Sequence, residues 1–156
     1  MKELLLATVL ALSPAQATAD VKVYFSKGHG VPGKVVPVTR TSPHAGVARF
    51  AVEQLIKGPT AAERRRGLHS ELTGKLRGRS DCGADFTLRI RKGTATLRFC
   101  RTVWGSGVGA DARALRTIEA TLKQFATVKK VVTLDKDGRC LFDQTDSGRS
   151  CVTGRE

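Results

Sequence analysis

FTLRIRKGTATLRF, residues 86–99, is the stretch that decides the fold. Lys92-Gly93 in its middle is typical of a two-residue hairpin turn, and the residues on either side alternate between apolar and polar. Pairing the two arms around this turn puts the apolar partners on one face, which predicts an antiparallel hairpin with one buried side. The facing pairs are Phe86–Phe99, Leu88–Leu97 and Ile90–Ala95 on the apolar face, and Thr87–Arg98 and Arg89–Thr96 on the other.

The same register favours one disulfide bond. It places Cys100 opposite Asp85, three residues from Cys82. The chain has four cysteines, an even number that is typical of disulfide bonding in an oxidising compartment. We expect Cys82 to pair with Cys100, and hence Cys140 with Cys151 to tie the C-terminal tail, while the other two connectivities stay open.

Helical spacing appears on both sides of the hairpin. Residues 45–57 carry an apolar stripe that ends at Gly58-Pro59, and residues 60–63 (TAAE) form a capping box for one more short turn. A second helix is expected near 110–126, with Asp111 as its cap. Its core-facing residues are Leu115, Ile118, Leu122 and Phe125.

The remaining patterns complete an α+β domain. β-rich runs at 21–25 and 35–40 should pair as a hairpin, and a third run covers 128–134. Residues 71–84 are polar, basic and contain glycine, so we expect a long surface loop there. The whole predicts a two-layer α+β sandwich with a mixed, largely antiparallel sheet and the two main helices on one face.

The N-terminus is typical of a cleaved signal peptide. A short start of three residues (MKE), an apolar run and the small residues ATA at 17–19 predict cleavage before Asp20, or two residues earlier. The apolar run is too short to span a bilayer, and no cysteine stands at the cleavage point to carry a lipid. We therefore expect a secreted or periplasmic soluble protein without a lipid anchor. Its parts would be a signal peptide (1–19), the α+β domain (20–143) and a disulfide-tied tail (144–156).

The charge is strongly positive, with 27 Lys and Arg against 14 Asp and Glu, a formal net charge of +13. Outside the cytoplasm this disfavours nucleic acid and favours anionic envelope polymers or an envelope protein as partner. The alternative is a solvated surface on a protein that is basic all round. The candidate basic face consists of Arg64, Arg65, Arg66, Lys75, Arg77, Arg79, Arg89, Arg91, Lys92 and Arg98.

The sequence does not favour a catalytic, metal or cofactor site. The glycines of residues 105–110 (GSGVGA) imitate a dinucleotide fingerprint, but the preceding strand alternates with arginines and is not that of a doubly covered sheet. No cysteine pair has C-x-x-C spacing, which disfavours zinc, and no G-x-S-x-G elbow or paired carboxylates stand out. We expect no catalytic residue, metal or cofactor. Trp104 could supply an aromatic contact, although core or edge packing is its commoner use.

Several segments resemble the GerM-type (GerMN) domain, a family of bacterial sporulation and spore germination proteins. They occur in the family's order: VKVYF at 21–25, VVPVTR at 35–40, AVEQLIKGPTAAE at 51–63, GLHSEL at 67–72, GTATLRF at 93–99 and TIEATLKQFATVKKVVTLDKDG at 117–138. The resemblance implies an extracytoplasmic α/β module without a known activity, similar to the ring-building folds of spore channel assemblies. The basic loop at 72–82 and the four cysteines depart from the family's pattern, which supports the fold and the compartment more than a spore role.

These features favour a non-enzymatic binding or assembly module of the bacterial cell envelope, which recognises its partner through the basic face. One alternative is a structural module that oligomerises, as the ring-building similarity implies. A lesser alternative is an enzyme or an accessory of a cell-wall hydrolase.

Overall fold

The computed structural model describes residues 18–30, 33–145 and 147–152. Almost the whole predicted signal peptide therefore lies outside the described residues. The helices are α1 (Val47–Lys57), α2 (Ala61–Arg65) and α3 (Val108–Lys123). The strands are β1 (Ala19–Lys27), β2 (Lys34–Ser42), β3 (Leu68–His69), β4 (Leu76–Arg77), β5 (Phe86–Arg91), β6 (Thr94–Phe99), β7 (Thr102–Val103) and β8 (Lys130–Leu134).

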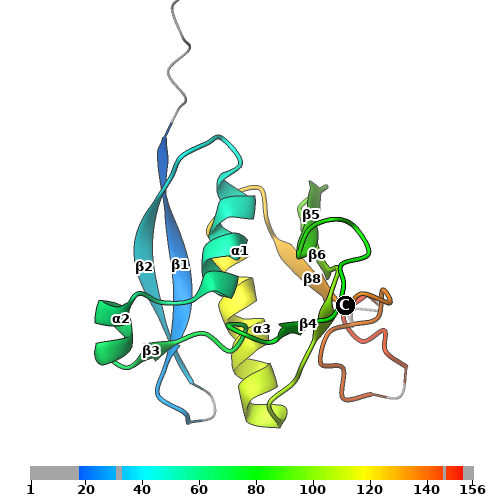
Figure 1. Ribbon diagram of the computed structural model, residues 1–156. Coiled ribbons are helices and arrows are strands. Elements are labelled where there is room, and N and C mark those ends of the chain that lie inside the picture. The colour runs from blue at the N-terminus through cyan, green and yellow to red at the C-terminus, as the bar shows by residue number, and fades with distance from the viewer. Residues whose placement is uncertain (1–17, 31–32, 146, 153–156) are drawn as a thin grey trace, which may run out of the picture.

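The strands form three sheets, in the orders β2-β1-β3, β4-β7 and β5-β6-β8. Only the β6–β8 pair among the described strands is parallel, so the predicted α+β class with mixed, largely antiparallel pairing is confirmed. In Figure 1 the β1–β2 hairpin stands on the left, the β5-β6-β8 sheet on the right, and α1 and α3 in the middle. Among the described helices, none is both long and apolar enough to cross a membrane.

The β5–β6 hairpin has the predicted register. Phe86 lies opposite Phe99 and Leu88 opposite Leu97. Phe86, Leu97 and Phe99 are buried, whereas Leu88 is half-buried and Ile90 is 36% exposed. The apolar face of the hairpin is thus buried at the end away from the turn and becomes more exposed toward the turn.

One core joins both hairpins to both long helices. Phe25 of β1, Leu55 of α1 and Ile118 of α3 are fully buried in the same cluster as Leu97 and Phe99. Burying each such side chain contributes about 1.5–3 kcal/mol, so the cluster accounts for the arrangement of the layers.

The C-terminal end of α3 is also tied to β1 by polar bonds. Gln124 accepts a hydrogen bond from Lys22 N at 2.8 Å and donates one to Lys22 O at 2.6 Å, while Thr121 Oγ1 accepts one from Tyr24 N at 3.1 Å. The amide of Gln124 therefore satisfies a donor and an acceptor of the β1 backbone, as a neighbouring strand would.

Three predicted boundaries differ. Asp111 was expected to cap α3, but the helix begins at Val108 after Gly107, whose φ of 96° favours glycine. Asp111 lies in the first turn, and its carboxylate accepts a hydrogen bond from Ser106 N at 3.0 Å. The expected loop at 71–84 contains β4, which pairs with β7, and the third β-rich run forms a strand only from Lys130.

The capping box of α2 is extended by a buried ion pair. Thr60 Oγ1 accepts from Glu63 N at 3.3 Å, and Glu63 Oε2 accepts from Thr60 N at 2.8 Å. Arg40 of β2 donates to both carboxylate oxygens of Glu63, at 2.8 and 2.6 Å. These bonds, with that from Arg40 the largest cause, lower the pKa of Glu63 from 4.5 to about 2, against the opposing effect of burial. The pair fastens α2 to the β1–β2 hairpin.

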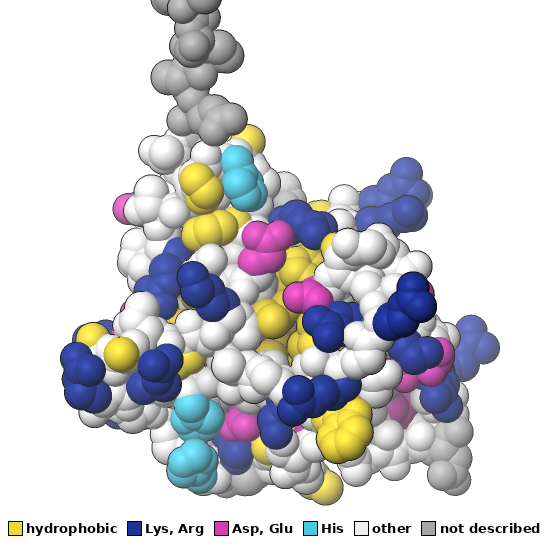
Figure 2. Space-filling model, in the orientation of Figure 1, with side chains coloured by type: hydrophobic (Ala, Val, Ile, Leu, Met, Phe, Trp, Pro, Cys, Tyr) yellow, Lys and Arg dark blue, Asp and Glu magenta, His cyan; other side chains and the backbone are white. Residues whose placement is uncertain are grey.

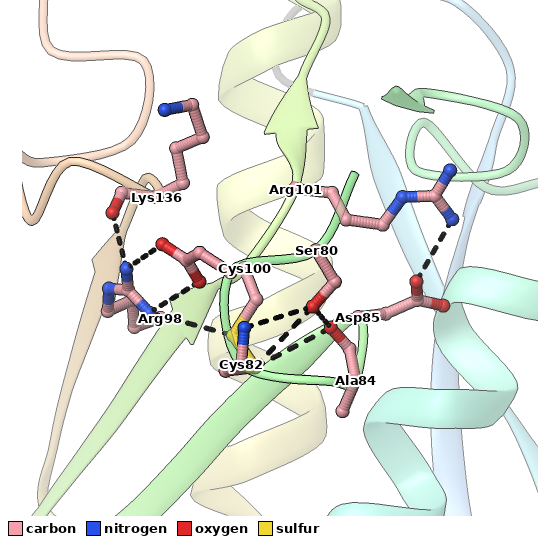
Figure 3. The surroundings of a disulfide bond; sticks show 9 residues. Ser80, Cys82, Ala84, Asp85, Arg98, Cys100, Arg101 and Lys136 are labelled. Atoms are coloured by element: carbon pink, nitrogen blue, oxygen red, sulfur yellow. Dashed lines mark hydrogen bonds and ion pairs between the residues drawn. A yellow bond between two sulfur atoms is a disulfide. The ribbon is translucent and has the colours of Figure 1, made fainter. Parts of the chain in front are cut away.

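The base of the β5–β6 hairpin is fixed by a disulfide and two ion pairs (Figure 3). Cys82 is bonded to Cys100, and Cys100 N donates to Asp85 O at 2.8 Å, as the register predicted. Arg98 pairs with Asp81 and also donates to Lys136 O at 2.5 Å, while Arg101 pairs with Asp85 at 3.1 Å. The second disulfide joins Cys140 to Cys151, so both bonds have the pairing preferred from the sequence.

We expect Glu63→Gln to lower the free energy of unfolding at neutral pH by about 1–3 kcal/mol, because Gln keeps the capping box but loses the charge that pairs with Arg40. The stabilisation by Glu63 is present above its ordinary pKa of 4.5 and is lost as the pH falls through about 2. The difference between variant and parent should therefore shrink below pH 4.5. Urea unfolding at several pH values measures it. Glu53→Gln, in an exposed pair, is the control and should cost less than about 0.5 kcal/mol.

Replacing Cys82 and Cys100 together by Ala should lower the free energy of unfolding by about 3 kcal/mol. The physical reason is that the unfolded chain gains the freedom of a loop whose ends are 18 residues apart. Urea unfolding without reductant measures the change. A loss below about 1 kcal/mol would mean that the neighbouring ion pairs hold the loop without the disulfide.

Candidate functional site

The ten basic residues singled out in the sequence lie in separate parts of the molecule. Arg64, Arg65 and Arg66 belong to α2 and its C-terminal end, and Lys75, Arg77 and Arg79 lie in or beside β4. Arg89, Arg91 and Lys92 lie at the turn end of the β5–β6 hairpin. Figure 1 shows α2 and β5 on opposite sides of the fold. Arg98 differs from the rest because Asp81 neutralises it. The ten residues are therefore spread across the width of the fold.

The hairpin end gathers two more cations that the sequence analysis missed. Lys129 N and Lys130 N both donate to Gly93 O, at 2.7 and 2.9 Å, and Lys130 lies opposite Thr94 in the parallel β6–β8 pair. Both lysines are exposed. The sequence signal for these cations was the pair Lys129-Lys130 before a β-branched run. Placing that pair beside the β5–β6 turn would have required a prediction that β6 and β8 are parallel neighbours.

We call this group the tip cluster. Within the described residues, none of its five side chains has an acidic partner. Figure 2 shows Lys and Arg side chains projecting at the turn end of the hairpin, on the upper right. The charges repel one another and raise the local positive potential, which favours an anionic partner. The tip cluster consists of Arg89, Arg91, Lys92, Lys129 and Lys130.

Two hollows lie between α1 and the apolar face of β5, and together we call them the groove. Its upper hollow, of about 330 Å³, is lined by residues 45–49, Leu88 and Ile90. Its lower hollow, of about 240 Å³, is lined by Arg49, Glu53, Ile56, Asp85 and Phe86. Figure 2 shows hydrophobic side chains in the hollow between α1 and β5, with charged side chains around it.

Arg49 is the residue that the two hollows share. Its guanidinium lies 4.9 Å from the centre of the Phe86 ring, and its Nε is 3.0 Å from Glu53 Oε1. The Arg49 side chain is 46% exposed. It therefore places a solvent-accessible cation between the two hollows, of which the lower is also lined by Glu53 and Asp85.

The histidines have structural partners. The rings of His29 and His69 are stacked with centroids 4.7 Å apart, and His69 Nε2 is 3.0 Å from Glu71 Oε1. Buried Arg113 donates to Glu71 at 2.7 Å and to His29 O at 3.0 Å. This network joins the β1–β2 turn to β3 and α3. The third histidine, His44, accepts a hydrogen bond from Gly46 N through its ring Nδ1 at 3.2 Å, and its carbonyl accepts one from Ser42 Oγ at 2.7 Å.

The other features noted in the sequence also have local explanations. The backbone N–H of Ser106, in the glycine-containing segment 105–110, already donates a hydrogen bond to the Asp111 carboxylate. A hollow of about 410 Å³ lies between α3, β8 and the C-terminal disulfide loop. Its Asp143 accepts hydrogen bonds from the N–H groups of Ser150 and Thr145, which lower the pKa of Asp143 to about 2. Trp104, at 63% exposed, is not core packing.

Comparison with known protein families identifies a family that matches most of this chain. The model of the Germane family, described as sporulation and spore germination, matches residues 22–139. No match to a curated protein was found.

Two solved structures share the fold. The tandem GerMN domains of the sporulation protein GerM from Bacillus subtilis are similar with a TM-score of 0.56 and 20% identity, over 86% of this chain and 48% of that chain. The first GerMN domain of the same protein is similar with a TM-score of 0.54 and 18% identity, over 87% of this chain and 90% of that chain. The chain thus spans about half the length of the tandem-domain protein and most of a single domain.

The family match covers both hairpins, both long helices and the parallel β6–β8 pair, and the solved GerMN domains have the same fold. The chain therefore belongs to the Germane family of sporulation and spore germination domains.

Proposed function

We propose that this protein is a non-enzymatic binding module that acts outside the cytoplasm and recognises an anionic component of the bacterial cell envelope. The observation that carries the proposal is the tip cluster, in which five exposed cations lie together without acidic partners among the described residues. A polyanion bound there releases its counterions, which gives affinity that does not depend on a deep pocket.

Two features support the location. Both disulfides form between residues of the described chain, and such bonds persist in oxidising compartments. The N-terminal segment that we predict to be a signal peptide is consistent with the same compartment.

Binding to purified cell walls and to an anionic polysaccharide should depend on salt and on the tip cluster. We expect co-sedimentation at low ionic strength, and a decrease of about tenfold or more in affinity between about 50 and 200 mM salt. The triple variant Lys92→Glu, Lys129→Glu and Lys130→Glu should abolish it, because it replaces attraction by repulsion at the proposed site.

The matched control is Arg65→Glu, Arg66→Glu and Arg79→Glu, three exposed residues of the other two basic groups. It changes the net charge equally and should retain most of the binding. Equal losses in the two triple variants would show that overall charge, not the tip cluster, determines binding. Binding that is absent, or indifferent to salt, would contradict the proposal.

A further inference from the structure

Strand β5 is a free edge of the β5-β6-β8 sheet. It pairs with β6 and with no other described strand. Because Cys100 N donates to Asp85 O, and hydrogen-bonded pairs alternate along an antiparallel ladder, Thr87, Arg89 and Arg91 bond to β6. The backbone N–H and C=O groups of Phe86, Leu88 and Ile90 therefore point away from β6. Phe86 is buried, so the open part of the edge is at Leu88 and Ile90. Such an edge is a template for another strand.

Several features that usually protect an edge strand are absent from β5. It contains no proline, its six residues pair regularly, and no described helix or loop donates a hydrogen bond to its outer side. The outer strand β2 of the other sheet, in contrast, contains Pro37. The cations on β5 discourage pairing with another basic chain but not with an acidic one.

The residues on the two faces of β5 determine which side chains would fit on a strand added at this edge. Side chains of the added strand on the side of Leu88 and Ile90 would enter the upper hollow beside α1, whose lining includes Val47 and Ala48. Side chains on its opposite side would lie beside Arg89 and Arg91, because strand residues alternate between faces. The two sides therefore select different chemistry, apolar on one and acidic on the other.

We infer that β5 and the groove beside α1 bind an extended segment of a partner protein, about five or six residues long, in which apolar and acidic residues alternate. This inference deepens the proposed function, because it assigns the tip cluster a protein partner. A second copy of the chain fits poorly, since no described strand carries two acidic residues and the net charge is +13.

The test uses a fluorescent peptide in which Val or Ile alternates with Asp or Glu, titrated with the full chain and followed by fluorescence anisotropy. A second peptide has the same sequence but is N-methylated on every amide that would face β5. Its charge is identical and its hydrogen bonds to the edge are removed. We expect the unmodified peptide to bind, and N-methylation to weaken binding by about tenfold or more.

Two variants make the same distinction on the protein. Ile90→Pro removes an outward-facing N–H without removing a bond to β6, as proline does on an edge strand, and should weaken binding by about tenfold. Ile90→Ala keeps that N–H and is its matched control, with a loss of about threefold at most. Thermal unfolding of both variants checks that the hairpin is intact.

Each outcome separates the inference from the proposed function. Equal binding of the plain and N-methylated peptides, lost at moderate salt, would overturn strand addition and leave the tip cluster as an anion site. Binding of neither peptide, with cell-wall binding retained, would overturn the inference alone. Dimerisation that depends on Ile90 in analytical ultracentrifugation would replace the partner strand by a second copy.

Discussion

The register of the β5–β6 hairpin is the constraint on which the rest of the structure depends. Side chains alternate along a strand, so this register alone sends Phe86, Leu97 and Phe99 into the core and Arg89 to solvent. It makes β6 the central strand, antiparallel to β5 and parallel to β8. A shift by one residue would bury the arginines and separate Cys82 from Cys100. The disulfide and the register therefore stabilise each other.

The acidic residues explain where the positive charge remains. Several are held in ion pairs that fix the fold, such as Glu63 with Arg40, Glu71 with Arg113, and Asp81 with Arg98. These pairs join α2 to β2, the segment after β3 to α3, and the loop that contains Cys82 to β6. Because the acids are engaged at these joints, the turn end of the hairpin keeps its cations uncompensated. The cations of the tip cluster, which have no such ion pairs among the described residues, are therefore the ones available for binding.

One disulfide lies inside the segment that matches the family, and the other lies just after it. The fold is shared with GerMN domains at 18–20% identity, because what must persist is the apolar pattern of the hairpins and helices. The cysteines lie at the base of the β5–β6 hairpin and in the segment after β8. They tie the loop before β5 and the C-terminal segment to the rest of the domain.

The sequence alone determined the elements whose information is local. The alternation around Lys92-Gly93 specified the hairpin pairs, and the TAAE motif specified the capping box of α2. The start of α3 was misplaced because Gly107, through its positive φ, begins the helix before the residue that the capping rule favours. The disulfide pairing followed from the register, since the register brought the two cysteines within reach.

Only the tertiary structure decided what lies beside what. Lys129 and Lys130 join Arg91 and Lys92 through a parallel pairing across about 35 residues of chain, which no local pattern encodes. Arg98 is not available to the basic face because it donates hydrogen bonds to Asp81 and to the carbonyl of Lys136, which folded loops place beside it. The groove exists because α1 packs against β1 and α3 and leaves the apolar face of β5 partly uncovered. Local sequence fixes which way a side chain faces, whereas long-range packing decides whether that face meets the core, an ion-pair partner or open solvent.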